Sequence, residues 1–126
     1  MDAAWRDAIE RGDANALAAL AGGGTDVNTR DRYGQTGLML AARNGRRDVV
    51  VSLIAHGAQL DVTAKYGLSA LMLAVVNGHA EIARDLARAG ADLSLVGSGA
   101  PGFAGKTARD LAAARGMNEL AAELGA

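Results

Sequence analysis

The sequence predicts an all-α fold, a solenoid of about four helix-turn-helix repeats joined by hairpin-like loops. Two observations predict it: motifs recur along the chain at a constant spacing, and glycines fall at the same points of each unit. The composition agrees. Hydrophobic residues make up 50% of the 126 residues but aromatic residues only 3%, and stacked small repeats can bury a continuous core without many large rings.

The repeat period can be read from identical residues. Tyr33 recurs as Tyr66, and the sequence LMLA at 38–41 recurs at 71–74, so the two motifs share one spacing. The same spacing extends backward into the N-terminal segment. Forward, the spacing grows, which indicates five inserted residues between positions 90 and 105. We therefore expect one domain over residues 1–126, with repeats at about 2–30, 31–63, 64–96 and 97–126.

Each of the last three repeats starts its first helix at a hydroxyl residue. Thr36, Ser69 and Thr107 stand directly before apolar runs, where a hydroxyl oxygen can accept a hydrogen bond from the free N–H groups of a helix start. Asn-Gly pairs at 44–45 and 77–78 then end two of these short helices, because both residue types tolerate the left-handed conformation.

A second helix follows in each repeat. Apolar residues on one face predict helices over about 46–55 and 79–89. Asp48 and Glu81 fall in the first turns, where the helix dipole favours negative charge. A glycine ends each helix, and the segment after it, 57–67 in the second repeat, is predicted to form an exposed hairpin-like loop.

These motifs resemble those of the ankyrin repeat family, whose unit of about 33 residues holds a turn, two antiparallel helices and a Thr-Pro-Leu-His-x-Ala signature. Residues 34–42 and 67–74 match the signature. Residues 24–28 match the family's Gly-Ala-Asp-Val-Asn loop, and residues 78–81 match its Gly-His-x-Glu helix start. The resemblance covers nearly the whole chain apart from the insertion.

The chain departs from the signature at two positions. The proline is replaced by glycine or alanine in every repeat, and the histidine is replaced by Met39, Met72 and Asp110. The hydrogen bonds that the histidine side chain makes in the family must therefore be lost or replaced here. Trp5 aligns with the apolar Leu38, so we expect it in the core, packed against the second repeat.

The resemblance implies a non-catalytic protein–protein interaction module. Partners of the family dock on a concave face that is built from the loop tips and the exposed side of each first helix. Carried over residue by residue, this face is expected to hold Arg32, Tyr33, Gln35, Met39, Arg43, Lys65, Tyr66, Leu68, Met72, Val76 and Phe103. The alternative is that Tyr33 and Tyr66 pack on one another and only order the loops.

Basic residues gather near the same edge, with Asp31 as the nearby acid. They favour a partner with an acidic surface, because complementary charge assists encounter and specificity. The alternative is that these side chains are simply solvated. The basic residues are Arg30, Arg32, Arg43, Lys65 and Lys106.

Residues 97–107 offer a competing function. A glycine-rich stretch followed by Gly-Lys-Thr resembles a phosphate-binding loop by order. The spacing fails, because the position that must hold the first glycine is Ala100. We favour a flexible inserted loop and keep a nucleotide-binding protein as the alternative, beside a detachable interaction subunit of a larger assembly.

Other classes find little support. His56 and His79 stand at predicted helix ends, and the chain has no cysteine, so no metal or cofactor is expected. A net charge of -1 argues against a diffuse basic nucleic-acid binder. The N-terminal stretch has no apolar signal-peptide core, and no window is apolar enough to span a membrane. We expect a cytoplasmic monomer that binds neither nucleic acid nor membrane.

Overall fold

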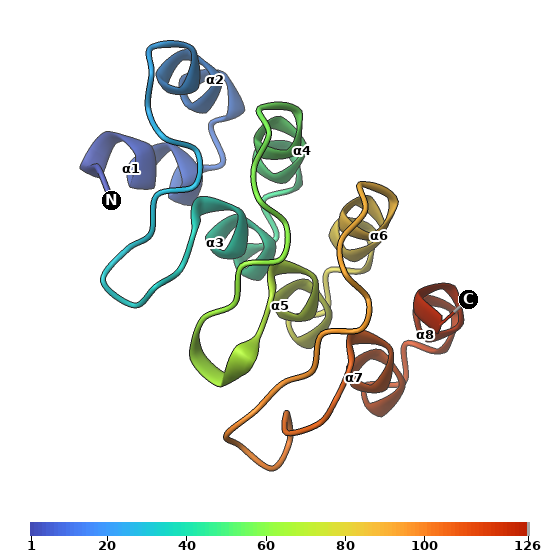
Figure 1. Cartoon of the computed structure of the whole chain (residues 1–126). Helices are drawn as coiled ribbons and strands as arrows, with labels where there is room; N and C mark the ends of the chain where they lie inside the picture. The colour runs from blue at the N-terminus through green and yellow to red at the C-terminus, as the bar shows by residue number, and fades with distance from the viewer. Residues whose placement is uncertain (126) are drawn as a thin grey trace.

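The computed structural model describes residues 1–125 and shows helix pairs stacked in a row (Figure 1). The described part of the chain contains no β-strand, only two isolated bridges, so the predicted all-α solenoid is confirmed. The first helices of the pairs are α1 (Ala3–Arg11), α3 (Gly37–Asn44), α5 (Ala70–Val76) and α7 (Ala108–Ala114). The second helices are α2 (Ala14–Gly22), α4 (Arg47–Ala55), α6 (Ala80–Arg88) and α8 (Asn118–Gly125).

The two helices of each pair lie in separate rows. First helices pack on first helices and second helices on second helices, in chain order, and the connecting loops extend beyond the row of first helices (Figure 1). The apolar core fills the space between the rows. This arrangement leaves the loop tips and one side of the first helices facing solvent.

Hydroxyl side chains cap the first helices of the last three repeats, as predicted. The side chains of Thr36, Ser69 and Thr107 each accept from the backbone N–H three residues later, at 3.2 or 3.3 Å. In two repeats the third residue also reaches back. The Thr36 N–H donates to Met39 Sδ at 3.5 Å, and the Thr107 N–H donates to Asp110 Oδ2 at 3.0 Å. A sulfur and a carboxylate therefore accept hydrogen bonds at two positions where the family has histidine.

Trp5 is fully buried, which confirms its predicted place in the core. It packs beside Gly37, where a Cβ atom would lie 3.1 Å from Trp5 Nε1 and 2.8 Å from Ile9 Cδ1. Such a contact is too close for a well-packed core. The absence of a side chain at the signature proline position therefore makes room for the first repeat.

Polar contacts join neighbouring repeats along the row of second helices, which we call the outer row. Arg47 of α4 binds Asp85 of α6 through two hydrogen bonds of 2.7 and 3.2 Å, and Arg84 Nε of α6 donates to Glu123 of α8 at 2.8 Å. Hydrogen bonds also join the loops of neighbouring repeats. The Gln59 N–H donates to Asn28 at 2.8 Å, and a matching bond of 2.8 Å forms at the next junction between the Asp92 N–H and Asp61.

Both histidines lie at helix ends, as predicted. His79 precedes α6, and its Nε2 lies 3.1 Å from the carbonyl oxygen of Arg43 in the preceding repeat. His56 follows α4, with Nδ1 2.7 Å from the Ser52 carbonyl oxygen. Over residues 1–125, no group of three or more potential ligands is placed to hold a metal ion. The same residues contain no helix with the length and apolar character that a membrane crossing requires.

Candidate partner-binding groove

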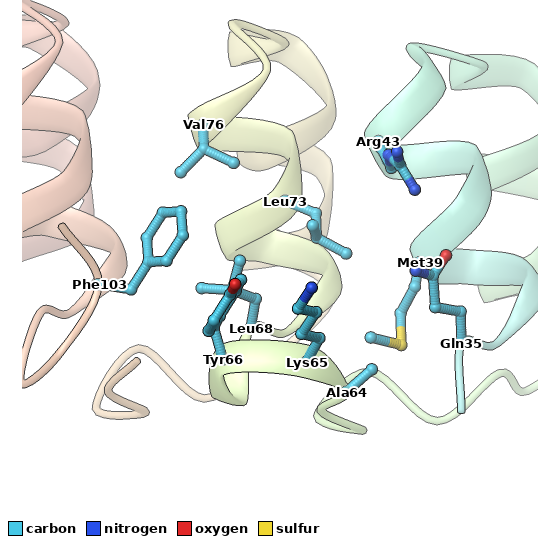
Figure 2. Close-up of a pocket in the computed structure, with 10 residues that line it drawn as sticks. All are labelled: Gln35, Met39, Arg43, Ala64, Lys65, Tyr66, Leu68, Leu73, Val76 and Phe103. Atoms are coloured by element: carbon cyan, nitrogen blue, oxygen red, sulfur yellow. The ribbon is translucent and has the colours of Figure 1, made fainter. Parts of the chain in front are cut away.

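A pocket of about 280 Å³ lies across the exposed side of α5, between α3 and the inserted loop (Figure 2). Three parts of the chain build it: the second repeat, the loop before α5 together with α5 itself, and the insertion. We call this feature the groove. Its lining residues are Gln35, Met39, Arg43, Ala64, Lys65, Tyr66, Leu68, Leu73, Val76 and Phe103.

The base of the groove is apolar. Met39 and Leu68 are only 1% and 6% exposed, so their side chains form its floor. Leu73 and Val76 are half-buried and lie three residues apart on α5, which places them on one face of the helix. An apolar side chain that enters the groove would therefore lose contact with water on several sides.

The inserted loop supplies one wall. The ring centroids of Tyr66 and Phe103 are 5.5 Å apart with an interplanar angle of 36°, a favourable tilted arrangement. The Ser98 N–H donates to the Tyr66 carbonyl oxygen at 2.7 Å. These contacts hold the insertion against the loop of the preceding repeat and keep Phe103 at the groove.

Two cations stand beside the apolar base. Arg43 and Lys65 are exposed, and Lys65 Nζ lies 4.9 Å from the ring centroid of Tyr66. Neither of them forms an ion pair within residues 1–125. The nearby Asp31 pairs with Arg6 at 3.8 Å rather than with either cation, and it accepts from the Tyr33 and Gln35 N–H groups at 2.9 Å.

The groove collects most of the site residues expected from the sequence. Arg32 and Tyr33 lie outside it, on the neighbouring loop tip, where the Arg32 guanidinium stands 5.0 Å from the Tyr33 ring centroid. Those that line it are Gln35, Met39, Arg43, Lys65, Tyr66, Leu68, Val76 and Phe103.

The expectation that Met72 lies on an accessible surface is wrong. Its side chain is 1% exposed, belongs to the core and, unlike the equally buried Met39, does not line the groove. The groove instead uses Leu73, which the sequence reasoning missed together with Ala64. The spacing from Val76 could not separate Leu73 from Met72, because these residues, three and four positions before it, both lie next to it on the helix surface.

The tyrosines do not pair in the way that the alternative interpretation supposed. Among the described aromatic residues, Tyr66 packs against Phe103 rather than against Tyr33. Tyr66 is therefore 37% exposed, whereas Tyr33, which has no inserted loop beside it, is 61% exposed. Both rings remain accessible at their loop tips.

The inserted loop gives no support for nucleotide binding. A phosphate-binding loop points successive backbone N–H groups at its ligand. Here the Gly97 N–H donates to Lys106 at 2.9 Å and the Gly105 N–H donates to Gly97 at 3.0 Å. The N–H groups of Ala100, Phe103, Ala104 and Lys106 also donate within the loop. These bonds hold in place a loop that was expected to be flexible, and they use most of the backbone N–H donors that a phosphate would need.

A family model described as ankyrin repeats, in three copies, matches residues 5–96, well over half of the chain. No curated protein sequence matches the chain. The matched segment spans α1 to α6 and contains the second and third repeats, which build most of the groove. The stacked helix pairs, their hydroxyl caps and this match agree: the chain belongs to the ankyrin repeat family.

Proposed function

We propose that this chain is a non-catalytic module that binds a protein partner through its concave edge, formed by the loop tips and the exposed side of α3 and α5. Ankyrin repeats are generally protein–protein interaction modules. What the family does not specify is the face used and the kind of partner. The distribution of charge in this chain favours one face and one kind of partner.

Charge pairing differs between the two sides of the solenoid, and this observation carries the proposal. On the outer row, Arg47, Arg84 and Arg88 all form ion pairs with carboxylates. At the concave edge, the basic residues form none within the described part of the chain. Unpaired cations beside an apolar groove suit a partner with an acidic surface. The basic residues of this edge are Arg30, Arg32, Arg43, Lys65 and Lys106.

The loop tips repeat a second feature that favours this edge. A cation lies over an aromatic ring in two successive repeats, at 5.0 Å for Arg32 on Tyr33 and at 4.9 Å for Lys65 on Tyr66. Tyrosine and arginine are enriched among the residues that dominate binding energy at interfaces. Two equivalent tips therefore present the same kind of contact to one partner.

A comparative pull-down from the native host tests the proposal. Quantitative mass spectrometry would compare the partners bound by three proteins: wild type, the double variant Tyr33→Ala with Tyr66→Ala, and the control variant Val51→Ala. Val51 is a 50% exposed apolar residue of α4, on the outer row, and serves as the matched control. We expect the double variant to lose partners that the control retains, with circular dichroism showing that all three are folded. If the double variant retains every partner, the concave edge is not the binding face.

A further inference from the structure

We propose that the groove accepts one apolar side chain from a partner segment that carries acidic residues next to it, and that Phe103 of the insertion forms the wall that limits the groove. The inference rests on the proposed function and specifies the ligand of the same surface. It follows from the size of the groove, its charges and the position of the inserted loop.

The size and chemistry of the groove fit a side chain. Its volume of about 280 Å³ falls just below the roughly 300–1,000 Å³ that is typical of small-molecule pockets. It is too small for a folded element, but its floor of Met39 and Leu68 and its flank of Leu73 and Val76 suit an apolar side chain. An extended segment could insert such a side chain while its backbone runs along the surface.

The charges specify what stands next to that side chain. Arg43 comes from α3 and Lys65 from the loop before α5, so the two cations approach the apolar base from different sides (Figure 2). None of the described residues that line the groove is a carboxylate. An Asp or Glu near the inserted side chain would give these cations the partner that the chain itself does not supply.

The insertion makes this groove different from the neighbouring junction. The extra residues occur only before the last repeat, and they place Phe103 against Tyr66. Tyr33, at the equivalent tip one repeat earlier, has no such ring beside it among the described residues. The wall therefore limits the length or bulk of the side chain that enters.

A peptide selection tests the inference. A phage-displayed library of short random peptides would be selected on the full chain, and the most enriched peptides would be synthesised with a fluorescent label. We expect enriched peptides to carry Leu, Ile, Met or Phe with Asp or Glu within two positions. In fluorescence polarisation, replacing the apolar residue by Ala, or the acidic residues by their amides, should weaken binding at least tenfold.

Variants of the protein locate the binding. Leu73→Arg should abolish peptide binding, and the milder Leu73→Ala should weaken it in case the first variant perturbs folding. Val51→Arg on the outer row is the matched control and should leave binding unchanged. Phe103→Ala should weaken binding about fivefold or more, and should allow bulkier apolar residues in a repeated selection.

The cations have their own readout. Arg43→Gln with Lys65→Gln should weaken binding and also reduce its dependence on salt, because screened charge pairs no longer contribute. Arg115→Gln is the control, since Arg115 is an exposed cation that follows α7 and lies outside the groove. A labelled single-stranded oligonucleotide would be measured in the same assay. Binding of the oligonucleotide as tight as that of the best peptide would overturn the inference.

Three further results would overturn it: no enriched peptide, enriched peptides without the apolar and acidic pair, or binding that survives Leu73→Arg. These results are distinguishable from a failure of the proposed function. If native partners are still lost in the Tyr33→Ala, Tyr66→Ala double variant, the concave edge binds proteins and only the assigned ligand chemistry is wrong.

Discussion

Tyr66 holds a backbone conformation that few side chains adopt. Its φ of 62° makes it the one non-glycine residue with positive φ among residues 1–125. Such a conformation costs of order 1 kcal/mol or more and persists only where the surroundings stabilise it. Here the Ser98 N–H donates to the Tyr66 carbonyl oxygen, and Phe103 packs on its ring. The insertion therefore stabilises the residue that forms part of the groove.

The inserted loop offers a matched pair of glycine variants. Gly97 is buried, and a Cβ atom there would clash with the backbone carbonyl of Phe103, whereas a Cβ at the exposed Gly102 meets nothing within 4 Å. We expect Gly97→Ala to lower the free energy of unfolding by about 1–3 kcal/mol, as overpacking does, and Gly102→Ala to change it by less than about 0.5 kcal/mol. Urea denaturation of both variants measures this. Equal effects would show that the Gly97 contact does not hold the loop.

The helices and their caps could be predicted from the sequence because their signals are local. A hydroxyl at Thr36 and a glycine after Asn44 act on the nearest turns of the chain, and both signals recur in the next repeat. The rotation of a helix about its axis is not local. One residue turns the side-chain direction by about 100°, so the accessible face was assigned to Met72 when it belongs to Leu73. The packing of Phe103 on Tyr66 could not be read from the period, because the inserted residues have no counterpart in the other repeats.

The start of α7 should respond to acid. The Thr107 backbone N–H, followed by its hydroxyl, lowers the pKa of Asp110 from the ordinary value of 3.8. Because the pKa is lower in the folded chain, the ionised carboxylate stabilises folding above pH 3.8, and this contribution is lost as the pH falls through the folded pKa. Asp110→Asn retains an acceptor oxygen but removes the charge. We therefore expect the variant to be less stable than wild type at pH 7, with the difference shrinking below pH 4.

Urea denaturation of both proteins at several pH values gives the comparison. Asp92 has a pKa that is also lowered, chiefly by the Ser94 hydroxyl, and it titrates equally in wild type and variant. It therefore cancels in the difference between the two proteins. A stability difference that stays constant from pH 7 to pH 3 would mean that the carboxylate charge does not stabilise the start of α7.

Over residues 1–125, the helices are joined mainly to their neighbours along the stack. They pack mainly within a repeat and on the next one, and the ion pairs from Arg47 to Asp85 and from Arg84 to Glu123 also connect adjacent repeats. The stability of such a solenoid is close to a sum of repeat and interface contributions. The groove lies where the second repeat, the third repeat and the inserted loop meet. It therefore depends on interfaces in the middle of the stack.

Two leucine variants separate local from global effects. Leu53 of α4 and Leu120 of α8 are 0% and 2% exposed, so truncation to alanine should cost about 2–5 kcal/mol at either site. Leu53 lies in an inner repeat, with α2 on one side of its helix and α6 on the other, whereas α8 ends the row.

In hydrogen exchange at native conditions, we expect Leu53→Ala to speed exchange in every helix, because both interfaces of the second repeat weaken. Leu120→Ala should speed exchange in α7 and α8 and leave α1 to α4 close to wild type. If Leu120→Ala speeds exchange in α1 and α2 as much as in α8, the chain opens as one unit, and the groove cannot keep its structure when the last repeat opens.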